Sequence, residues 1–138
     1  MPPKKKVQRE CCFRVPFGQD LTEGILRSCR QKGITAGMVL CIGAVQGATL
    51  GFYHQKHKRY EWHRKKHPME IVSGIGNVSM KDRRLFLHLH VSLSDSRGRV
   101  CGGHLSSPTP VFACEVFVRT TAQGLVRKYD RQTGLFLW

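Results

Sequence analysis

The sequence predicts an α+β domain with a largely antiparallel β-sheet and flanking helices. One amphipathic helix pattern occurs early in the chain, and many short strand-like segments follow it. Glycine-rich or charged turns of hairpin length separate these segments. The 138 residues, 41% of them hydrophobic, are enough for one domain with a core and too few for two. We therefore expect a flexible basic tail over residues 1–10 and a single domain over residues 11–138.

A strand and a helix are predicted at the start of the domain. Imperfect alternation of apolar residues suits a strand that begins near Cys11 and ends at Phe17. Asp20 then caps a helix through the amide of Glu23, while Glu23 reaches back, and Gly33 ends the helix. The apolar stripe of this helix consists of Leu21, Ile25, Leu26 and Cys29.

The remaining apolar segments are typical of strands. Residues 38–45 are almost wholly apolar, so they form either a strand covered on both faces or a short buried helix, and Gly43 and the β-branched residues favour the strand. Residues 49–53 are predicted to return as its hairpin partner, and residues 54–67 are predicted to be an exposed basic segment. Further strands are predicted over residues 69–73, 78–80, 85–93, 100–105 and 111–119.

The composition limits partners and location. Lys and Arg number 23 against 9 Asp and Glu, so the formal charge is +14 and attraction to DNA or another polyanion is expected. Neither a run of about 18 apolar residues nor a signal-peptide pattern occurs. We therefore expect no membrane association and a nuclear or cytoplasmic protein that is not secreted. The six cysteines include no C-x-x-C pair, which favours reduced, packed thiols over a disulfide framework.

Two histidines are predicted to share one face of a strand. In residues 85–93 the odd positions are apolar, so the period of two places His88 and His90 together on the opposite face. Residues two apart on a strand lie roughly 6.5 Å apart at Cα, a gap that two imidazoles can bridge by converging on one ion.

A third histidine is predicted to join them through hairpin register. The segment from Asp95 to Arg99 suits a three-residue loop with Gly98 in the left-handed conformation. Such a loop pairs Asp95 with Arg99 and places His104 opposite His90. A bulge or a different loop length would move this pairing, so the placement depends on the turn.

Three neutral imidazoles with one open position are the ligand set of zinc sites that keep water or substrate in the fourth place. The cluster of His88, His90 and His104 is therefore a candidate site for zinc or another divalent metal. The alternative is a group of partly buried, hydrogen-bonded histidines in a strand pair. Gly102 and Gly103 are what a backbone needs where another group approaches closely, and they favour the metal site.

Several sequence blocks then follow one another in a characteristic order. They are residues 17–21 (FGQDL), 42–44 (IGA), 69–77 (MEIVSGIGN), 87–94 (LHLHVSLS), 102–105 (GGHL) and 112–116 (FACEV). Across residues 11–120 the chain resembles the PPC family (plants and prokaryotes conserved, also called DUF296). The succession of the histidine-containing blocks is the specific part of this likeness.

The resemblance implies an α+β domain that assembles as a homotrimer. Some prokaryotic members hold a metal ion through histidines of these blocks, which implies His88, His90 and His104 here. Glu70, Asn77 and Glu115 lie in matching blocks and are candidate polar partners of the metal ligands. Turn formation by Asn77 and a satisfied buried carboxylate at Glu115 are the equally weighted alternatives.

The chain departs from the plant members of the family. These are nuclear proteins with AT-hooks, whereas here Arg97-Gly-Arg99 is followed by valine and belongs to a hairpin, so the minor-groove reader is missing. In plant members the block that matches residues 69–73 is implicated in binding partner proteins. Nuclear protein partners are therefore an expectation from the resemblance.

Two basic features suit contact with phosphates. Lys4, Lys5 and Lys6 resemble a short nuclear import signal, with a solvated tail as the alternative. Residues 54–67 interleave cations with aromatic residues, which suits phosphate contacts and base stacking, or a surface loop enriched in charge for solubility. The candidate nucleic-acid-binding residues are Lys56, Lys58, Arg59, Tyr60, Trp62, Arg64, Lys65 and Lys66.

Two functional hypotheses follow. The first is a trimeric DNA- or chromatin-associated protein with a three-histidine metal site. The second is a metal-dependent enzyme or small-molecule-binding protein, in which metal-bound water is the nucleophile and Glu70 or Glu115 accepts a proton. The first is favoured, because the sequence has no nucleophile with an adjacent base and no phosphate-binding glycine loop.

Overall fold

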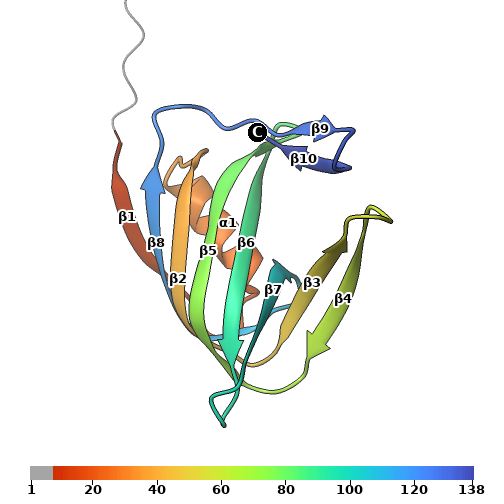
Figure 1. The fold of residues 1–138 in the computed structure, drawn as a ribbon. Helices are drawn as coiled ribbons and strands as arrows, with labels where there is room; N and C mark the ends of the chain where they lie inside the picture. The colour runs from red at the N-terminus through yellow and green to blue at the C-terminus, as the bar shows by residue number, and fades with distance from the viewer. Residues whose placement is uncertain (1–7) are drawn as a thin grey trace, which may run out of the picture.

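The computed structural model describes residues 8–138 as a strongly curved antiparallel sheet of eight strands with one helix on one face (Figure 1). The strand order is β1-β8-β2-β5-β6-β7-β3-β4, and every pairing between these strands is antiparallel. A separate two-stranded hairpin, β9–β10, follows at the C-terminal end. The expected α+β class is confirmed, although residues 8–138 contain a single α-helix where flanking helices were expected.

The elements have the following bounds. They are β1 (Glu10–Val15), α1 (Leu21–Gln31), β2 (Gly37–Val45), β3 (Ala48–His54), β4 (Arg59–Lys65), β5 (Met69–Lys81), β6 (Arg84–Ser94), β7 (Val100–Ser106), β8 (Val111–Thr120), β9 (Lys128–Asp130) and β10 (Leu135–Leu137).

The helix begins and ends as the sequence predicts. The carboxylate of Asp20 accepts a hydrogen bond from the amide of Glu23 at 3.1 Å, and it also accepts one from the amide of Thr109 at 2.7 Å. The cap therefore ties the start of α1 to the segment before β8. Gly33 follows the helix with φ of +64°, a conformation that glycine adopts without a steric penalty.

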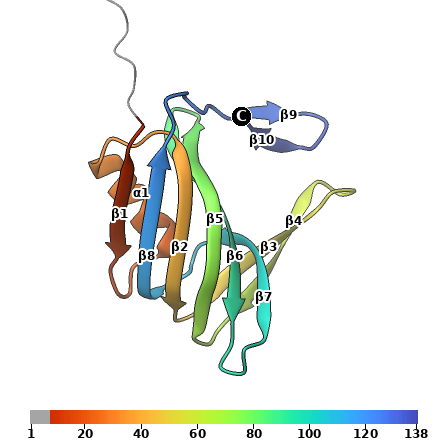
Figure 2. The same cartoon turned by 60° about the vertical axis from the view of Figure 1, so that its left-hand side comes forward.

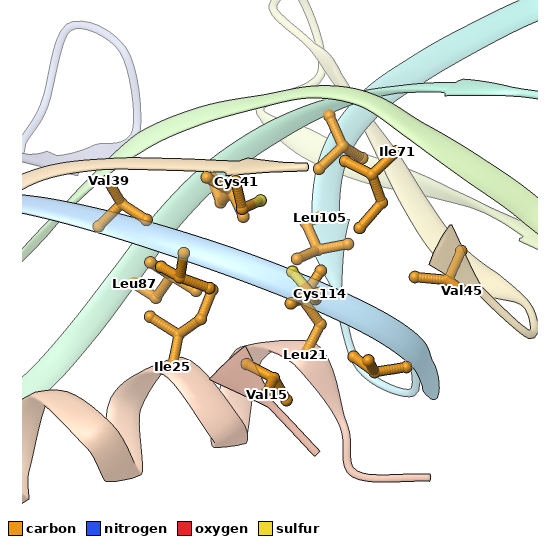
Figure 3. Close-up of a cluster of buried hydrophobic side chains, with 14 of the residues drawn as sticks. Val15, Leu21, Ile25, Val39, Cys41, Val45, Ile71, Leu87, Leu105 and Cys114 are labelled. Carbon is orange, nitrogen blue, oxygen red and sulfur yellow. The ribbon is translucent and has the colours of Figure 1, made fainter. Parts of the chain in front are cut away.

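The core lies between α1 and the sheet face that it covers (Figure 3). Ile25 and Leu21 of the helix are fully buried, and Figure 3 shows Ile25 next to Leu87 of β6. Burying side chains of this size stabilises the fold by roughly 1.5–3 kcal/mol each. The core therefore holds the central strands together, including the strand that carries two of the three histidines.

The central strand β2 departs from the prediction in two ways. It lies between β8 and β5, whereas a hairpin with residues 49–53 was expected, and that expectation is wrong. The short Gln46-Gly47 connection sends the chain to the far side of the sheet, where β3 pairs with β7 and β4. The strand is also covered on one face alone, because Leu40 and Ile42 are 42% and 51% exposed.

Two further differences concern chain segments of the sheet. Residues 69–73 and 78–80 belong to one strand, β5, because the intervening Gly74 and Gly76 pair regularly with β6; the register shifts earlier, between Ile71 and Ser73. The basic segment 54–67 contains β4, so it forms a hairpin with β3 that projects from the sheet (Figures 1 and 2). A strand forms here because Tyr60 and Trp62 alternate with charged residues.

The remaining expectations concern the termini, the thiols and membrane spans. The basic residues Lys4, Lys5 and Lys6 lie outside the described residues. The sheet starts at Glu10, and Arg9 already donates from its amide to Oγ1 of Thr120 at 3.0 Å.

All six cysteines are free. In the part of the chain that the structure describes, no helix has the length and hydropathy to cross a membrane.

Candidate metal centre

His88 and His90 lie on the face of β6 that is turned away from the helix. Leu87, Leu89 and Val91 are buried in the core, and the period of two therefore turns both imidazoles to the other side. The two rings have centroids 5.0 Å apart, and their Nε2 atoms are 3.2 Å apart. The predicted sharing of one face is confirmed.

The hairpin between β6 and β7 places the third histidine beside them. The amide of Asp95 donates to the carbonyl of Arg99 at 3.0 Å, and Gly98 has φ of +74°, as the three-residue loop requires. His90 then pairs with His104 across the two strands. The predicted register is therefore confirmed: the turn and the apolar pattern both favour the pairing that the structure shows.

The two glycines of β7 allow the strands to approach closely. A Cβ atom at Gly102 would lie 2.5 Å from the carbonyl oxygen of Val91, and one at Gly103 would lie 2.8 Å from that of Gly51. Either approach would push a neighbouring strand away. The glycines thus hold β7 between β6 and β3, and His104 with it.

The three histidines have the geometry of a metal ligand set. One ring nitrogen from each lies within 4.8 Å of the others. In tetrahedral zinc coordination, nitrogens at about 2.0–2.1 Å from the metal lie about 3.3 Å from one another, close to the 3.2 Å between His88 and His90. The His104 ring lies 5.2 Å from His88 and 5.5 Å from His90 by centroids, so the residues present fit a zinc-type ion.

The protonation state of the cluster also suits a metal ligand. Burial, followed by the nearby His90 and Arg127, lowers the pKa of His88 to about 4. Burial and the other two histidines likewise lower the pKa of His104 to about 4. Both rings are therefore neutral at pH 7, which is the form that binds metal. Among the buried side-chain polar atoms of residues 8–138, Nδ1 of His104 alone lacks a hydrogen-bond partner.

A pH prediction follows for the metal-free protein. A histidine in the unfolded chain has a pKa near 6.5, so between pH 6.5 and 4 the unfolded chain binds protons that folded His88 and His104 do not. The free energy of unfolding should therefore fall as the pH decreases through this range. Above pH 6.5 these two histidines should not make the free energy of unfolding depend on pH. Urea unfolding in EDTA at stepped pH measures the effect.

The His88→Asn/His104→Asn double variant provides the comparison. It retains every carboxylate, so it should lose less stability between pH 6.5 and 4 than the wild type. An identical slope in the two proteins would contradict the burial of neutral imidazoles at this site.

A cavity of about 670 Å³ opens above the histidines. Its floor is the histidine cluster, and its walls come from β3, β4, the ends of β5 and β6, and the C-terminal hairpin. The tips of the two hairpins are tied together: Tyr53 donates from its hydroxyl to the carbonyl of Thr133, and Lys58 donates to the carbonyl of Arg131, both at 2.8 Å. In Figures 1 and 2 the turns of both hairpins lie on the same side of the sheet.

The candidate polar partners of the cluster lie in different places. Asn77 pairs with His88 across β5 and β6, and its Oδ1 accepts from Arg127 at 2.7 Å and from Trp138 at 3.2 Å. Glu70 pairs with Ser94 far along β6, and exposed Glu115 lies on β8, three strands away. The structure therefore brings Asn77 to the site and leaves both carboxylates outside the cavity.

The candidate nucleic-acid residues also divide into groups. Lys58, Arg59 and Tyr60 line the cavity, and the Tyr60 ring lies 4.9 Å from His104 by centroids. Trp62 stacks on Tyr60 at 4.9 Å and is 48% exposed. The remaining cations lie on the outside of the hairpin or next to it, away from the cavity, and they are Lys56, Arg64, Lys65 and Lys66.

Sequence reasoning missed the residues that close the cavity. Arg127 is 6% exposed, and Phe136 belongs to a hairpin that was not predicted. The hairpin strands are three residues long, so they show no periodicity. The Arg-Gln-Thr-Gly turn at residues 131–134 is the one local signal that could have indicated it.

The fold and the cluster together define a class: a small α+β domain with a three-histidine centre of the metal-binding type under an open cavity. Residues 3–122 match the model of the Plants and Prokaryotes Conserved (PCC) domain. The chain belongs to this family, the PPC family that its sequence resembles.

Solved structures support the same assignment. A metal-containing protein from Archaeoglobus fulgidus is 44% identical, with a TM-score of 0.90 over 98% of this chain and 96% of its own. A plant- and prokaryote-conserved (PPC) protein from Pyrococcus horikoshii is 37% identical, with a TM-score of 0.88 over 94% and 90% of the two chains. A protein from Bacteroides thetaiotaomicron, provisionally described as DNA-binding, is 28% identical, with a TM-score of 0.87 over 96% and 93%.

Curated relatives are much longer than this chain. Bifunctional protein GlmU from Synechococcus sp. (strain JA-3-3Ab) is 30% identical over 121 residues, which are 87% of this chain and 18% of that protein. A second GlmU from the same genus matches over 13% of its length. The chain thus spans less than a fifth of the length of these relatives.

Proposed function

We propose that this protein binds a divalent metal, with zinc as the first candidate, through His88, His90 and His104, and that it associates with DNA as a homotrimer. The observation that carries the metal proposal is the convergence of three imidazoles, two of them kept neutral by burial, on the floor of one cavity. The Archaeoglobus relative, described as metal-containing, supports it.

A binding role is favoured over a hydrolytic one. Zinc bound by three imidazoles would supply a Lewis acid and a water of lowered pKa. Among residues 8–138, however, no carboxylate lines the cavity, and Glu70 and Glu115 lie outside it. The described chain thus offers the metal no acidic proton acceptor, which is why we propose a structural or ligand-binding centre.

The exposed face of the sheet supports the proposal of a trimer. Leu40, Ile75 and Phe117 are adjacent across β2, β5 and β8, and they are 42%, 56% and 51% exposed. Ile75 pairs in turn with His90. Large apolar side chains that gather on one face mark an interaction surface. A second copy of the chain on this face would cover the apolar row and reach the edge of the metal centre.

The β3–β4 hairpin supports the proposal of DNA binding. It projects from the sheet (Figure 2), and its single acid, Glu61, lies 2.6 Å from His54 and 3.5 Å from His63. Its exposed cations are thus free of carboxylate partners within residues 8–138. A trimer would present three such hairpins to one polyanion and bind it with avidity. The sequence at Lys4, Lys5 and Lys6, which resembles a nuclear import signal, supports the proposal of a nuclear location.

Salt dependence tests the DNA proposal. Affinity for a fluorescent 20-base-pair duplex should fall linearly on a log–log scale as salt rises. Replacing four hairpin cations by Gln should reduce the slope by about 0.9 for each phosphate that the variant no longer neutralises. The substituted residues are Lys56, Arg64, Lys65 and Lys66.

A matched variant controls for net charge. It replaces four exposed cations on other elements by Gln and should keep most of the wild-type slope; its residues are Arg14, Arg27, Lys32 and Lys128. Equal slopes in the two variants would show that the hairpin is not the DNA-binding surface. If the affinity of the wild type did not change with salt, phosphate contacts would be excluded as the basis of binding.

A further inference from the structure

The charged side chains outside the histidine cluster that line the cavity are all cationic. Its walls contain Lys58, Arg59, Lys81 and Arg127, and within the described residues its lining includes no Asp or Glu. The Lys81 ammonium lies 3.9 Å from the centroid of Phe136, so the positive charge is held at the cavity wall. A metal ion on the histidines would add further positive charge. A cavity of this kind attracts an anion.

Arg127 is the strongest single indication. It is buried, with 6% of its surface exposed, yet in residues 8–138 no carboxylate forms an ion pair with it. Its guanidinium donates to Oγ of Ser79 at 2.7 Å, to Oδ1 of Asn77 at 2.7 Å and to the carbonyl of Phe136 at 2.8 Å. All three acceptors are neutral.

Two donors of this guanidinium remain for a ligand. Arginine carries five N–H groups, and the three hydrogen bonds above use one at each nitrogen. A buried charge is costly unless it is paired, and Arg127 lines the cavity. An anion in the cavity would supply the missing negative partner, in a planar geometry that suits a carboxylate or a phosphate.

The rest of the wall is aromatic. Phe86 lies 5.0 Å by ring centroid from the guanidinium carbon of Arg127, and Phe136 and Tyr60 line the same cavity. Such rings accept a flat apolar group by stacking. Arg127 and Phe136 also lie beyond residue 122, where the match to the family domain ends. The segment after residue 122 therefore adds one wall to a cavity whose other lining residues lie within the matched domain.

We propose that the cavity binds a small organic anion, with one carboxylate or phosphate-type group and a flat apolar body. The anionic group lies between the histidine floor and Arg127, and the apolar body packs among Phe86, Phe136 and Tyr60. The inference rests on the proposed metal centre for the floor of the site, whereas the cations of the walls belong to the chain itself. It deepens the proposed function by naming the ligand class.

Calorimetric titration with three probes tests the proposal. Phenylphosphonate and benzoate carry the two kinds of anionic group on the same ring, and benzamide is their neutral analogue. Each is titrated into EDTA-treated and zinc-loaded protein. We expect at least one anion to bind both forms and to bind the zinc form more tightly, with benzamide binding roughly tenfold more weakly. Whichever anion binds better identifies the head group.

Charge variants locate the site. Arg127→Gln should weaken binding of the anion roughly 10- to 100-fold, because it removes two charge-assisted donors. The double variant Lys58→Gln/Lys81→Gln leaves the hydrogen bonds of Arg127 intact and should weaken binding of the anion roughly tenfold. The matched control Lys128→Gln removes an exposed charge next to Arg127 and should bind like the wild type. If Arg127→Gln fails to fold, the double lysine variant decides.

Three results would overturn the proposal: no binding of either anion to either form, equal binding of benzamide, or wild-type affinity in both cavity variants. Failure of the metal centre has a different signature. If the protein takes up no zinc, but the anion still binds and Arg127→Gln weakens its binding, the anion site is supported and the metal site is refuted.

Discussion

His104→Ala is expected to lose nearly all bound metal. With one of the three proposed ligands removed, the remaining two imidazoles should bind zinc at least about 100-fold more weakly. This loss exceeds the roughly 10- to 100-fold loss that follows when a residue supporting a ligand is removed. Untagged wild-type protein dialysed against zinc should retain about one ion per chain, and the variant less than about a tenth. Elemental analysis by plasma mass spectrometry measures both, and it also identifies the metal in protein as purified.

Other histidines provide the control. His67→Ala removes an exposed imidazole outside the cluster and should keep the wild-type metal content. His88→Ala and His90→Ala should each behave like His104→Ala, since each removes one ligand of the same set. Unchanged metal content in all three variants would end the metal proposal and leave the cluster as buried, hydrogen-bonded histidines.

Leu40→Asp is expected to convert the proposed trimer to a monomer. The Leu40 side chain lies in the middle of the exposed apolar row, and a carboxylate buried there by a second copy would cost several kcal/mol at each interface. The monomer itself should fold, because this side chain points away from the core. Sedimentation equilibrium at micromolar concentration should show three times the 15.7 kDa chain mass for the wild type and the single chain mass for the variant.

Val126→Asp is the matched control. Val126 is an apolar residue that is 56% exposed. It lies before the C-terminal hairpin and forms an isolated bridge with Met80 at the end of β5, away from the apolar row, so the charge there should leave the mass unchanged. A wild-type mass of 15.7 kDa would refute the trimer. A Leu40→Asp variant that remains at the wild-type oligomeric mass would place the interface on another surface.

The candidate metal centre could be predicted because its determinants are local. Alternation along residues 85–93 decides the face of His88 and His90, and the loop from Asp95 to Arg99 decides the register of His104. Both signals lie within about 20 residues of chain. No packing information from the remainder of the protein is needed to combine them.

The sheet order could not be predicted in the same way. Residues 38–45 are apolar on both faces, which indicates burial, yet the structure buries one face and exposes Leu40 and Ile42. A sequence pattern cannot distinguish a side chain covered by the core from one that a partner would cover. The pairing of β2 with β8 joins residues 66 to 83 positions apart, and hairpin proximity wrongly favoured residues 49–53.

Local sequence signals were enough to predict the fold class, the helix with its cap at Asp20, and the three histidines on one face, because turn chemistry and period-two alternation act over short distances. The surroundings of the histidines depend instead on long-range packing. The fold brings Arg127 and Phe136 from the C-terminal segment to a cavity whose other strands supply residues between Gly51 and His104. Interactions of that kind depend on how separate elements pack in three dimensions, and no local pattern encodes them.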